Sequence, residues 1–409
     1  MSQPPSWNTL DGLNAGGKRV FVRCDFNVPL SREGGGPRIT DDTRVRAVLP
    51  TLERLRSSGA RVILASHLGR PKGKPDPALG LAPVARRLGE LLGADVPLAP
   101  DCIGEEAASL AEGLRPAGFL MLENLRFHAG EEKDEEGFAR ELASLADAYV
   151  NDAFGCSHRA HASVVAIVDH LRPAVAGLLL DRELRILGRL MEAPDRPVVA
   201  ILGGAKVSDK LGVIESLLRR VDRILIGGAM AFTFLKAQGK EVGKSRVEHE
   251  MIETALRLLR AAEGGGCEIL LPVDCVAAEK FAPDADHRTI ALEENPENWD
   301  DWMGLDVGPK TVSRFADALA DAKTIVWNGP LGVFEMDAFS RGTYEMLDRV
   351  VSSGATTLIG GGDTDLAVHR AGAAEKVSFI STGGGAFLEL LEGKELPGVA
   401  ALKKAAQRG

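Results

Sequence analysis

Cationic side chains recur after several apolar runs in the first half of the chain. The stretch RVILASHLGRPKGKP carries an apolar run followed by His67, Arg70, Lys72 and Lys74. Other runs are followed by Arg23, Asp25 and Asn27 in RCDFNVP, Arg44 in DDTRVRA, Arg126 in ENLRF, and His158, Arg159 and His161 in SHRAH. Guanidinium groups offer forked donors that suit phosphate or carboxylate, and histidine adds donors near neutral pH. A single such arginine is more often a solvated charge or a salt-bridge partner, but the repetition predicts a site for a small polyanion.

Two features of this half have competing interpretations. Asp25 either stabilises a turn or, together with Asn27, binds substrate hydroxyl groups. Cys156, His158 and His161 have spacings that a metal ion could use, but structural zinc needs four protein ligands and catalytic zinc needs three and a water. Because no compact further ligand stands nearby in the sequence, we favour anion binding for the segment CSHRAH.

Glycine loops follow four apolar runs in the second half of the chain: ILGGAKVSDK, LIGGAMAFTF, LIGGGDTDLAV and ISTGGGAFLEL. Glycine lets the backbone approach a phosphate closely, and a helix N-terminus supplies free N–H groups and a positive dipole. Lys206 and Lys210 stand four residues apart, on one face of a helix, and add mobile positive charge. One loop of this kind could be an ordinary turn, but four favour a nucleotide site, although the signature GxxxxGK[ST] is absent.

Two segments of this half could complete a nucleotide site. Asp363, in GGGDT, could coordinate Mg²⁺ on the nucleotide phosphates or could equally cap a helix. The segment WNGPLGVFE supplies a mixed apolar and polar set suited to the ring and ribose of a nucleoside: Asn328, Pro330, Val333 and Glu335.

A recurring unit positions these residues: a short apolar run, a loop, and a stretch with apolar residues three or four apart. The runs are apolar at successive positions, which indicates strands covered on both faces, as in parallel sheets built from βαβ units. Segments such as VRAVLPTLERLRSS and LGVIESLLRRV are the expected crossover helices. The predicted fold class is therefore α/β, and its ligands should bind at the carboxyl ends of the strands, where the cations and glycine loops stand.

Length and local composition predict two domains. At 409 residues the chain is long enough for two cores. A charged amphipathic segment with two prolines, DRELRILGRLMEAPDRP, predicts a linker helix over residues 181–196. The expected domains are residues 1–180 and 197–392, with a short basic helix in residues 393–409.

Composition limits the partners. A net charge of −9 argues against a surface built for nucleic acid. The start of the chain, MSQPPSWN, lacks a basic segment with an apolar core, and no run reaches roughly 18 apolar residues. Five scattered cysteines without a CxxC pair suit free thiols in a reducing compartment. We expect a cytoplasmic protein that binds neither nucleic acid nor membrane.

From about residue 8 to residue 409 the chain resembles the phosphoglycerate kinase family, of bacterial type. The resemblance rests on RCDFNVP, SHLGRP, ENLRF, NDAFGCSHRAH, GGAKVSDK, NGPLGVFE, GGGDT and STGGGAFLELLEG, which occur in the family's order. It implies two Rossmann-like lobes that face a central cleft, with the C-terminus returning to the first lobe, and a monomer. It also implies reversible, Mg²⁺-dependent phosphoryl transfer from 1,3-bisphosphoglycerate to ADP, giving 3-phosphoglycerate and ATP.

The resemblance also assigns roles to residues. The phosphoglycerate-binding positions are Asp25, Asn27, Arg44, His67, Arg70, Arg126 and Arg159. The nucleotide-binding positions are Lys206, Lys210, Asn328, Pro330, Val333, Glu335, Gly361, Gly362, Asp363 and Thr364, with further glycine-loop positions at Gly383, Gly384 and Gly385. The catalytic positions are Arg44, Lys206, Gly362 and Gly385, and Asp363 is the expected metal ligand.

Departures and alternatives accompany this assignment. The chain has Cys24, Cys156-Ser157, Phe232 and Phe387 where the family often has other residues, which bears on the adenosine pocket and on thiol sensitivity at Cys24. The linker helix and Ser381-Thr382 are the hinge candidates.

A nicotinamide dehydrogenase would need GxGxxG and a later acidic residue, which are absent. A non-catalytic anion- and nucleotide-binding paralogue is the remaining alternative, although Lys206, Lys210 and Asp363 are all retained.

Overall fold

A computed structural model describes residues 5–31, 37–292 and 299–408. Residues 1–4 lie outside the described residues. They belong to the segment MSQPPSWN, which we used to predict a cytoplasmic protein. The chain divides into two compact units, one reaching Ile186 and including the residues from Glu395 onward, the other comprising Leu187–Lys394. The division falls inside helix α8 (Leu178–Glu192), within the segment in which we expect the linker.

The first unit is built on a parallel sheet in which β1 occupies the centre. Its strand order is β5-β4-β1-β6-β7, with all pairs parallel. The strands are β1 (Arg19–Arg23), β4 (Arg61–Ala65), β5 (Phe119–Met121), β6 (Ala148–Asn151) and β7 (Ala174–Ala176). The last four residues of β1 and β4 and all of β6 are buried, so both faces of the sheet are covered, as predicted from the continuous apolar runs. The chain leaves β1 toward β4 and later returns to β6 on its other side, so a topological switch point lies between β1 and β6.

Short helices surround this sheet, and a two-stranded antiparallel ribbon, β2 (Leu30–Ser31) with β3 (Arg38–Ile39), lies outside it. The α-helices are α1 (Thr43–Ala47), α2 (Leu49–Ser57), α3 (Ala82–Leu92), α4 (Gly104–Glu112), α5 (Ala129–Glu132), α6 (Glu136–Ser144), α7 (Ile167–His170) and α16 (Pro397–Gln407). The 3-10 turns are η1 (Leu10–Gly12), η2 (Pro77–Leu79), η3 (Leu125–Phe127) and η4 (Phe154–Cys156).

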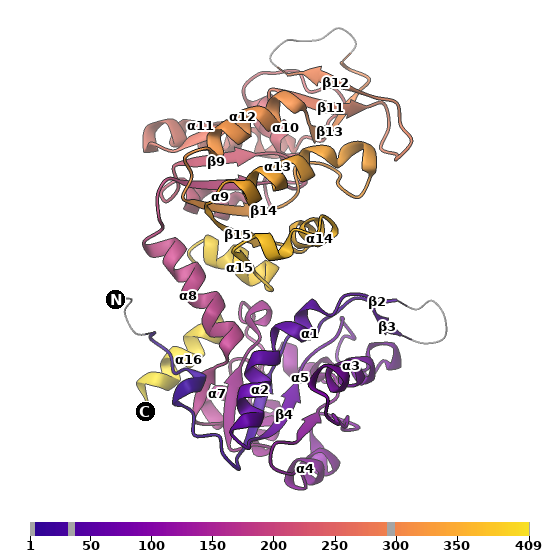
Figure 1. Ribbon diagram of the computed structural model, residues 1–409, viewed down its shortest axis with the longest axis vertical. Coiled ribbons are helices and arrows are strands. Elements are labelled where there is room, and N and C mark those ends of the chain that lie inside the picture. The colour runs from indigo at the N-terminus through magenta and orange to yellow at the C-terminus, as the bar shows by residue number, and fades with distance from the viewer. Residues whose placement is uncertain (1–4, 32–36, 293–298, 409) are drawn as a thin grey trace. The chain divides into compact units, whose positions relative to one another are not determined.

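Helix α16, from the C-terminal end of the chain, is part of the first unit. It packs against α7 and β7, and in Figure 1 its yellow ribbon lies among the indigo and magenta elements. Leu402 is fully buried, the amide of Gly398 donates to the carbonyl of Ser157, and Lys404 forms an ion pair with Asp169.

The second unit contains a six-stranded parallel sheet in the order β10-β9-β8-β14-β15-β16. The strands are β8 (Val198–Leu202), β9 (Arg223–Ile226), β10 (Glu268–Leu270), β14 (Thr324–Asn328), β15 (Thr356–Gly360) and β16 (Phe379–Ile380). This is the Rossmann order, with the first and fourth strands in sequence side by side at the centre. The predicted α/β class with parallel sheets is confirmed.

The helices of this unit pack in pairs, α10 with α11 and α12 with α13, while α9 packs against α15. Their bounds are α9 (Leu211–Leu217), α10 (Met230–Ala237), α11 (Ile252–Gly265), α12 (Pro309–Leu319), α13 (Arg341–Ser352), α14 (Gly362–Arg370) and α15 (Gly384–Leu391). The 3-10 turns are η5 (His249–Met251), η6 (Asp337–Phe339) and η7 (Ala374–Lys376). None of the described helices combines the length and the hydrophobicity that crossing a membrane demands.

Three parts of the fold were not foreseen from the pattern of apolar runs. The first is the ribbon of β2 and β3, whose strands have two residues each. Strand β7 has only three residues, which is too short for a recognisable run. A three-stranded antiparallel sheet, β12-β11-β13, adds β11 (Asp274–Ala278), β12 (His287–Ala291) and β13 (Met303–Val307) to the second unit. Its outer strand β12 begins with three exposed residues, so its sequence lacks the continuous apolar character on which the prediction relied.

Candidate functional site

Arg44 lies beside the loop that follows β1. Its Nη1 lies 3.3 and 3.2 Å from the Oδ1 and Oδ2 atoms of Asp25 and donates to the carbonyl oxygen of Asn27 at 3.1 Å. The Arg44 side chain is 36% exposed and that of Asp25 is 13% exposed. Arg44 is therefore held by the loop while its guanidinium stays accessible to a ligand.

Asp25 and Asn27 both hold the backbone of this region. Asp25 Oδ1 accepts from the amide of Asn27 at 3.2 Å, so its carboxylate stabilises the turn as well as positioning Arg44. Asn27 Oδ1 accepts from the amide of Gly69 at 2.8 Å, which joins the loops after β1 and β4. The turn-forming role of Asp25 is thus present, and hydroxyl binding by this pair stays a prediction.

Arg126 and Arg159 lie near the same loops. Arg126 is 3% exposed, donates from Nη1 to the carbonyl of Gly69 at 2.8 Å, and has its Nε 3.3 Å from Glu132 Oε1. Arg159 follows η4, and its Nε donates to the Nε2 of His158 at 3.1 Å. Burial lowers the pKa of Arg126, Glu132 opposes this shift, and the positive charge of Arg159 adds to it, so the two guanidinium groups repel each other. An anion would relieve that repulsion.

Arg23 does not belong with the ligand-binding arginines. It is completely buried, its Nε donates to Ser163 Oγ at 2.7 Å, and its Nη2 lies 3.7 Å from Glu131 Oε1. It also donates to the carbonyl of Cys24. Its guanidinium is thus enclosed by protein partners, and we assign it a supporting role.

His67 is a neutral ring among positive charges. It is 4% exposed, and burial, followed by the charges of Arg23 and Arg126, moves its pKa well below the ordinary value. Its Nδ1 lies 3.4 Å from Arg23 Nη2 and 3.8 Å from Cys156 Sγ. Neutral imidazole keeps one N–H donor, so the ring can still bind an anion while the arginines supply the charge.

The remaining cations of the loop after β4 are exposed. Arg70, Lys72 and Lys74 all lie at the surface of the first unit. Arg70 follows Gly69, whose φ of +63° turns the loop, so its accessible side chain remains a candidate contact. Lys72 and Lys74 are expected to face solvent and to raise the local concentration of anions.

In the second unit, Lys210 and Asn328 meet at the switch point of the sheet. Asn328 ends β14, its Nδ2 donates to the carbonyl of Gly360 at 2.7 Å, and its Oδ1 accepts from Lys210 Nζ. Burial lowers the pKa of Lys210 to about 8, although the charges of Asp209 and Asp363 oppose this shift. Lys210 is therefore a partly desolvated cation directly beyond the ends of β8, β14 and β15.

The glycines at this edge allow close packing of loops. A Cβ on Gly203 would lie 2.0 Å from the carbonyl oxygen of Pro330, and Gly329 has a φ of +94°. The amide of Gly329 donates to Thr364 Oγ1 at 2.7 Å, which connects the loop after β14 with helix α14. Pro330 is half-buried and Thr364 is buried.

Asp363 lies in the first turn of α14 and is exposed. The helix N-cap is Gly361, so the capping alternative for Asp363 is wrong and its carboxylate is free of that role. Its charge acts on Lys210, which indicates that it faces the same region. Oxygen ligands of this type suit Mg²⁺. Lys206 is also exposed, on the loop between β8 and α9. The expectation that Lys206 and Lys210 share a helix face is wrong, because α9 begins only at Leu211 and Lys210 is its N-cap.

The glycine loops after β15 and β16 lie side by side. A Cβ on Gly384 would approach Gly361 Cα at 3.6 Å and Gly362 N at 3.8 Å. Gly362 begins α14, while Gly385 stands in the first turn of α15, after Gly383. Two helix N-termini therefore present unpaired amides to a common region, which suits an anion better than a neutral ligand.

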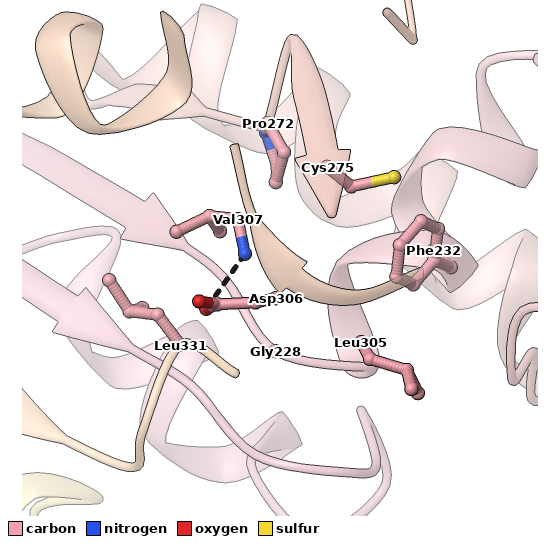
Figure 2. A pocket seen from close by; sticks show the side chains of 8 residues that line it. All are labelled: Gly228, Phe232, Pro272, Cys275, Leu305, Asp306, Val307 and Leu331. Carbon is pink, nitrogen blue, oxygen red and sulfur yellow. Dashed lines mark hydrogen bonds between the residues drawn. The ribbon is translucent and has the colours of Figure 1, made fainter. Parts of the chain in front are cut away.

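Val333 and Glu335 lie farther along the loop after β14. Val333 is half-buried, and its amide donates to the carbonyl of Leu305 at 2.9 Å. Glu335 is exposed. Neither lines the small cavity of about 10 Å³ in Figure 2, which is bordered by Gly228, Phe232, Pro272, Cys275, Leu305, Asp306, Val307 and Leu331. That volume has room for about one water molecule and is too small for a base.

Three of the residues that depart from the family pattern have structural roles in this fold. The Phe232 ring packs against Gly304, where a Cβ would lie 2.0 Å from Cζ, and Phe387 packs in the same way against Gly360. Cys24 is completely buried, and burial raises the pKa of its thiol well above the ordinary value. A buried protonated thiol reacts poorly, which argues against the thiol sensitivity expected at Cys24.

A family model described as phosphoglycerate kinase matches residues 10–394. The phosphoglycerate kinase of Geobacter metallireducens is 56% identical over 388 residues, covering 95% of this chain and 96% of that protein. That of Synechococcus elongatus is 54% identical over 407 residues, covering 98% and 100%. The solved structure of the Coxiella burnetii phosphoglycerate kinase superposes with a TM-score of 0.87 at 39% identity, covering 98% of this chain and 100% of that one. The Pyrococcus horikoshii enzyme gives 0.86 at 32% identity, covering 98% and 99%.

Proposed function

The chain belongs to the phosphoglycerate kinase family and is a phosphotransferase, and from this we propose that it catalyses reversible, Mg²⁺-dependent transfer between 1,3-bisphosphoglycerate and ADP. The products are 3-phosphoglycerate and ATP. We propose that the first unit binds the phosphoglycerate and the second binds the nucleotide.

The observation that carries the proposal is the cationic cluster of the first unit. Arg126 and Arg159 lie close enough to repel each other, and the charges of both act on a neutral His67. Arg44 has a carboxylate nearby in Asp25, and Arg126 has one in Glu132. Clustered guanidinium groups, of which Arg126 is buried and Arg44 and Arg159 are partly exposed, favour a compact ligand with several negative charges. Phosphoglycerate, with a phosphate and a carboxylate, has that chemistry.

For the nucleotide, we propose that Lys206 and Lys210 bind phosphate oxygens. Asn328 orients Lys210 through its Oδ1. Pro330, Val333 and Glu335 would border the nucleoside, and the amides of Gly361 and Thr364 would contribute further donors. The exposed Asp363 carboxylate would hold Mg²⁺, which neutralises charge on the nucleotide phosphates when bound.

The proposed chemistry needs no general base. The attacking group is either the carboxylate of 3-phosphoglycerate or a terminal phosphate oxygen of ADP, and both are ionised near pH 7. Catalysis then depends on positioning and on donors directed at the equatorial oxygens of the transferring phosphoryl group. We assign these donors to Arg44, to Lys206 and to the amides of Gly362 and Gly385.

Arg44→Ala tests the proposal, with Arg46→Ala as the matched control. Arg46 is two residues away on α1, is 53% exposed and pairs with Asp42. Removing one well-placed donor costs about 10²–10³ in kcat. We therefore expect acyl-phosphate formation from 3-phosphoglycerate and Mg-ATP, trapped with hydroxylamine, to collapse in Arg44→Ala and to stay within about twofold of wild type in Arg46→Ala.

The same assay distinguishes a phosphoglycerate kinase from the alternative function, non-catalytic binding. A folded wild-type protein that binds nucleotide and phosphoglycerate without forming acyl phosphate would be a non-catalytic binding paralogue. Equal losses in both arginine variants would instead show that Arg44 has no special role.

A further inference from the structure

A second group of metal-ligating side chains lies in the first unit, outside the anion site. Ligand atoms of Asp101, Cys102 and His128 all lie within 4.8 Å of one another. Asp101 and Cys102 precede helix α4, and His128 follows the turn η3 that carries Arg126. The set combines an oxygen, a sulfur and an imidazole nitrogen, which are the ligands that Zn²⁺ prefers.

The geometry of the group is fixed by its own hydrogen bonds. His128 Nε2 and Asp101 Oδ1 are 2.6 Å apart, and the same oxygen accepts from the amide of Cys102 at 2.6 Å. The His128 ring stacks on Phe138, with centroids 5.3 Å apart and planes 24° apart. Two of the three candidate ligands therefore already face each other, and the imidazole orientation is held by packing.

A cavity reaches two of the three candidate ligands. Asp101 and His128 line this cavity of about 630 Å³, which Glu123 also lines, while Cys102 is buried behind them. Glu123 Oε1 accepts from the amides of Leu81 and Asn124, at 2.8 and 2.7 Å, so this carboxylate is fixed nearby. The cavity supplies both an entry path and room for a water in the open fourth position of a three-ligand site.

The surroundings distinguish this group from the other such cluster in the described residues, Asp25 with His67 and Cys156. That second cluster lies among buried guanidinium groups, and their positive charges oppose a cation. The group at Asp101 instead has two further carboxylates, Asp76 and Glu123, on the wall of its cavity, with one guanidinium, that of Arg86.

We propose that Asp101, Cys102 and His128 form a binding site for a borderline-soft divalent cation of the Zn²⁺ class. Tetrahedral bonds of about 2.0–2.3 Å separate ligand atoms by roughly 3.3–3.8 Å. The Nε2 to Oδ1 distance must therefore open by about 0.7 Å, which the partly exposed Asp101 and His128 side chains allow. The cation takes the place of the proton on Nε2, which passes through solvent to Nδ1 and leaves the ring neutral. Cys102 is buried and, like Cys24, carries a protonated thiol, so it loses that proton to solvent only as its sulfur bonds to the cation.

Co²⁺ is the probe for this site, because a cobalt–thiolate bond gives a charge-transfer absorption band. The full-length protein, free of Mg²⁺ and substrates, is titrated with Co²⁺ and its metal content is measured after gel filtration. We expect one Co²⁺ per chain with the thiolate band in wild type. Cys102→Ser should abolish the band, and His128→Gln should weaken binding by at least about 100-fold. Cys267→Ser, which changes a buried cysteine of the second unit, should leave both unchanged.

Zn²⁺ provides a second readout that does not depend on colour. Binding to the native state raises Tm, so an equivalent of Zn²⁺ should raise the unfolding midpoint of wild type and not that of His128→Gln. His128 is partly exposed, so this variant serves if Cys102→Ser fails to fold. Neither readout uses phosphoryl transfer, so the site can fail while the proposed function stands.

Three outcomes would overturn the proposal. One is a wild type without a thiolate band at one equivalent of Co²⁺. Another is a band that persists in Cys102→Ser or disappears in Cys156→Ser, because the thiolate ligand would then lie elsewhere. The third is an equal rise of Tm with Zn²⁺ in wild type and His128→Gln.

Discussion

Lys210 combines burial with the nucleotide-binding role that we propose for it. Burial lowers its pKa to about 8, whereas the pKa of an unfolded lysine is near 10.5. The unfolded chain therefore binds more protons between pH 8 and 10.5, so this group makes the free energy of unfolding rise with pH across that window. Ligand binding should show the opposite trend, since nucleotide phosphates require the charged amine.

We predict that nucleotide affinity falls as pH rises through about 8. With a pKa of about 8, roughly a tenth of Lys210 stays protonated at pH 9, so Kd should weaken about tenfold between pH 7 and pH 9. Lys210→Gln should bind more weakly at pH 7 and lose this dependence, as measured by isothermal titration calorimetry. Lys244→Gln, at an exposed ion pair with Asp301, should keep the wild-type profile. A Lys210→Gln protein with an unchanged pH profile would remove Lys210 from the nucleotide site.

At the scale of elements, the loops after β8 and β14 pack with no space between them. Gly203 allows this, because any Cβ there would lie 2.0 Å from the Pro330 carbonyl and 2.5 Å from the Gly329 carbonyl. Backbone atoms cannot move away without separating the ends of two neighbouring strands. The positions of Asn328 and Lys210 depend on those ends.

We predict that Gly203→Ala weakens nucleotide binding by at least about tenfold and lowers stability by about 1–3 kcal/mol, as expected for overpacking. Gly188→Ala is the control, because it lies within α8 and a Cβ there meets no atom within 4 Å. Alanine should stabilise that helix by about 0.5–1 kcal/mol and leave the Kd unchanged. Urea unfolding and nucleotide titration measure both effects. Wild-type affinity in Gly203→Ala would show that the switch point does not position the nucleotide.

Helices and strands also show where pattern reasoning succeeds. Continuous apolar runs predicted the α/β class and both parallel sheets, because strands covered on two faces need apolar residues at every position. The same pattern did not predict strand β7, because this strand is short. It did not predict the sheet β12-β11-β13 either, because its outer strand is exposed. Their identity depends on neighbours that are distant in the chain.

At the scale of the whole molecule, the proposed reaction needs two ligands to meet. Direct transfer requires donor and acceptor oxygens in line across one phosphorus atom, with water excluded. Because we assign the ligands to different units, binding both must bring those units together. The linker in α8 and Ser381-Thr382 remain the candidate hinges.

We predict that 3-phosphoglycerate and a non-hydrolysable Mg-ATP analogue together reduce the radius of gyration, whereas either ligand alone has a smaller effect. Small-angle X-ray scattering measures this change. The Arg44→Ala variant with both ligands present reports whether the decrease depends on the phosphoglycerate site. An unchanged radius in wild type under saturating ligands would exclude closure of this kind.

Local periodicity and short motifs are enough to predict the α/β class, the family and the residue types that stand after each strand. Which of those residues are accessible depends on how distant segments pack. Arg23 and Arg44 look alike in sequence, yet one is enclosed by Ser163 and Glu131 while the other is 36% exposed. Lys210 meets Asn328 across 118 residues. Residues so far apart in the chain come into contact because the parallel strands bring their carboxyl ends to one edge of the sheet.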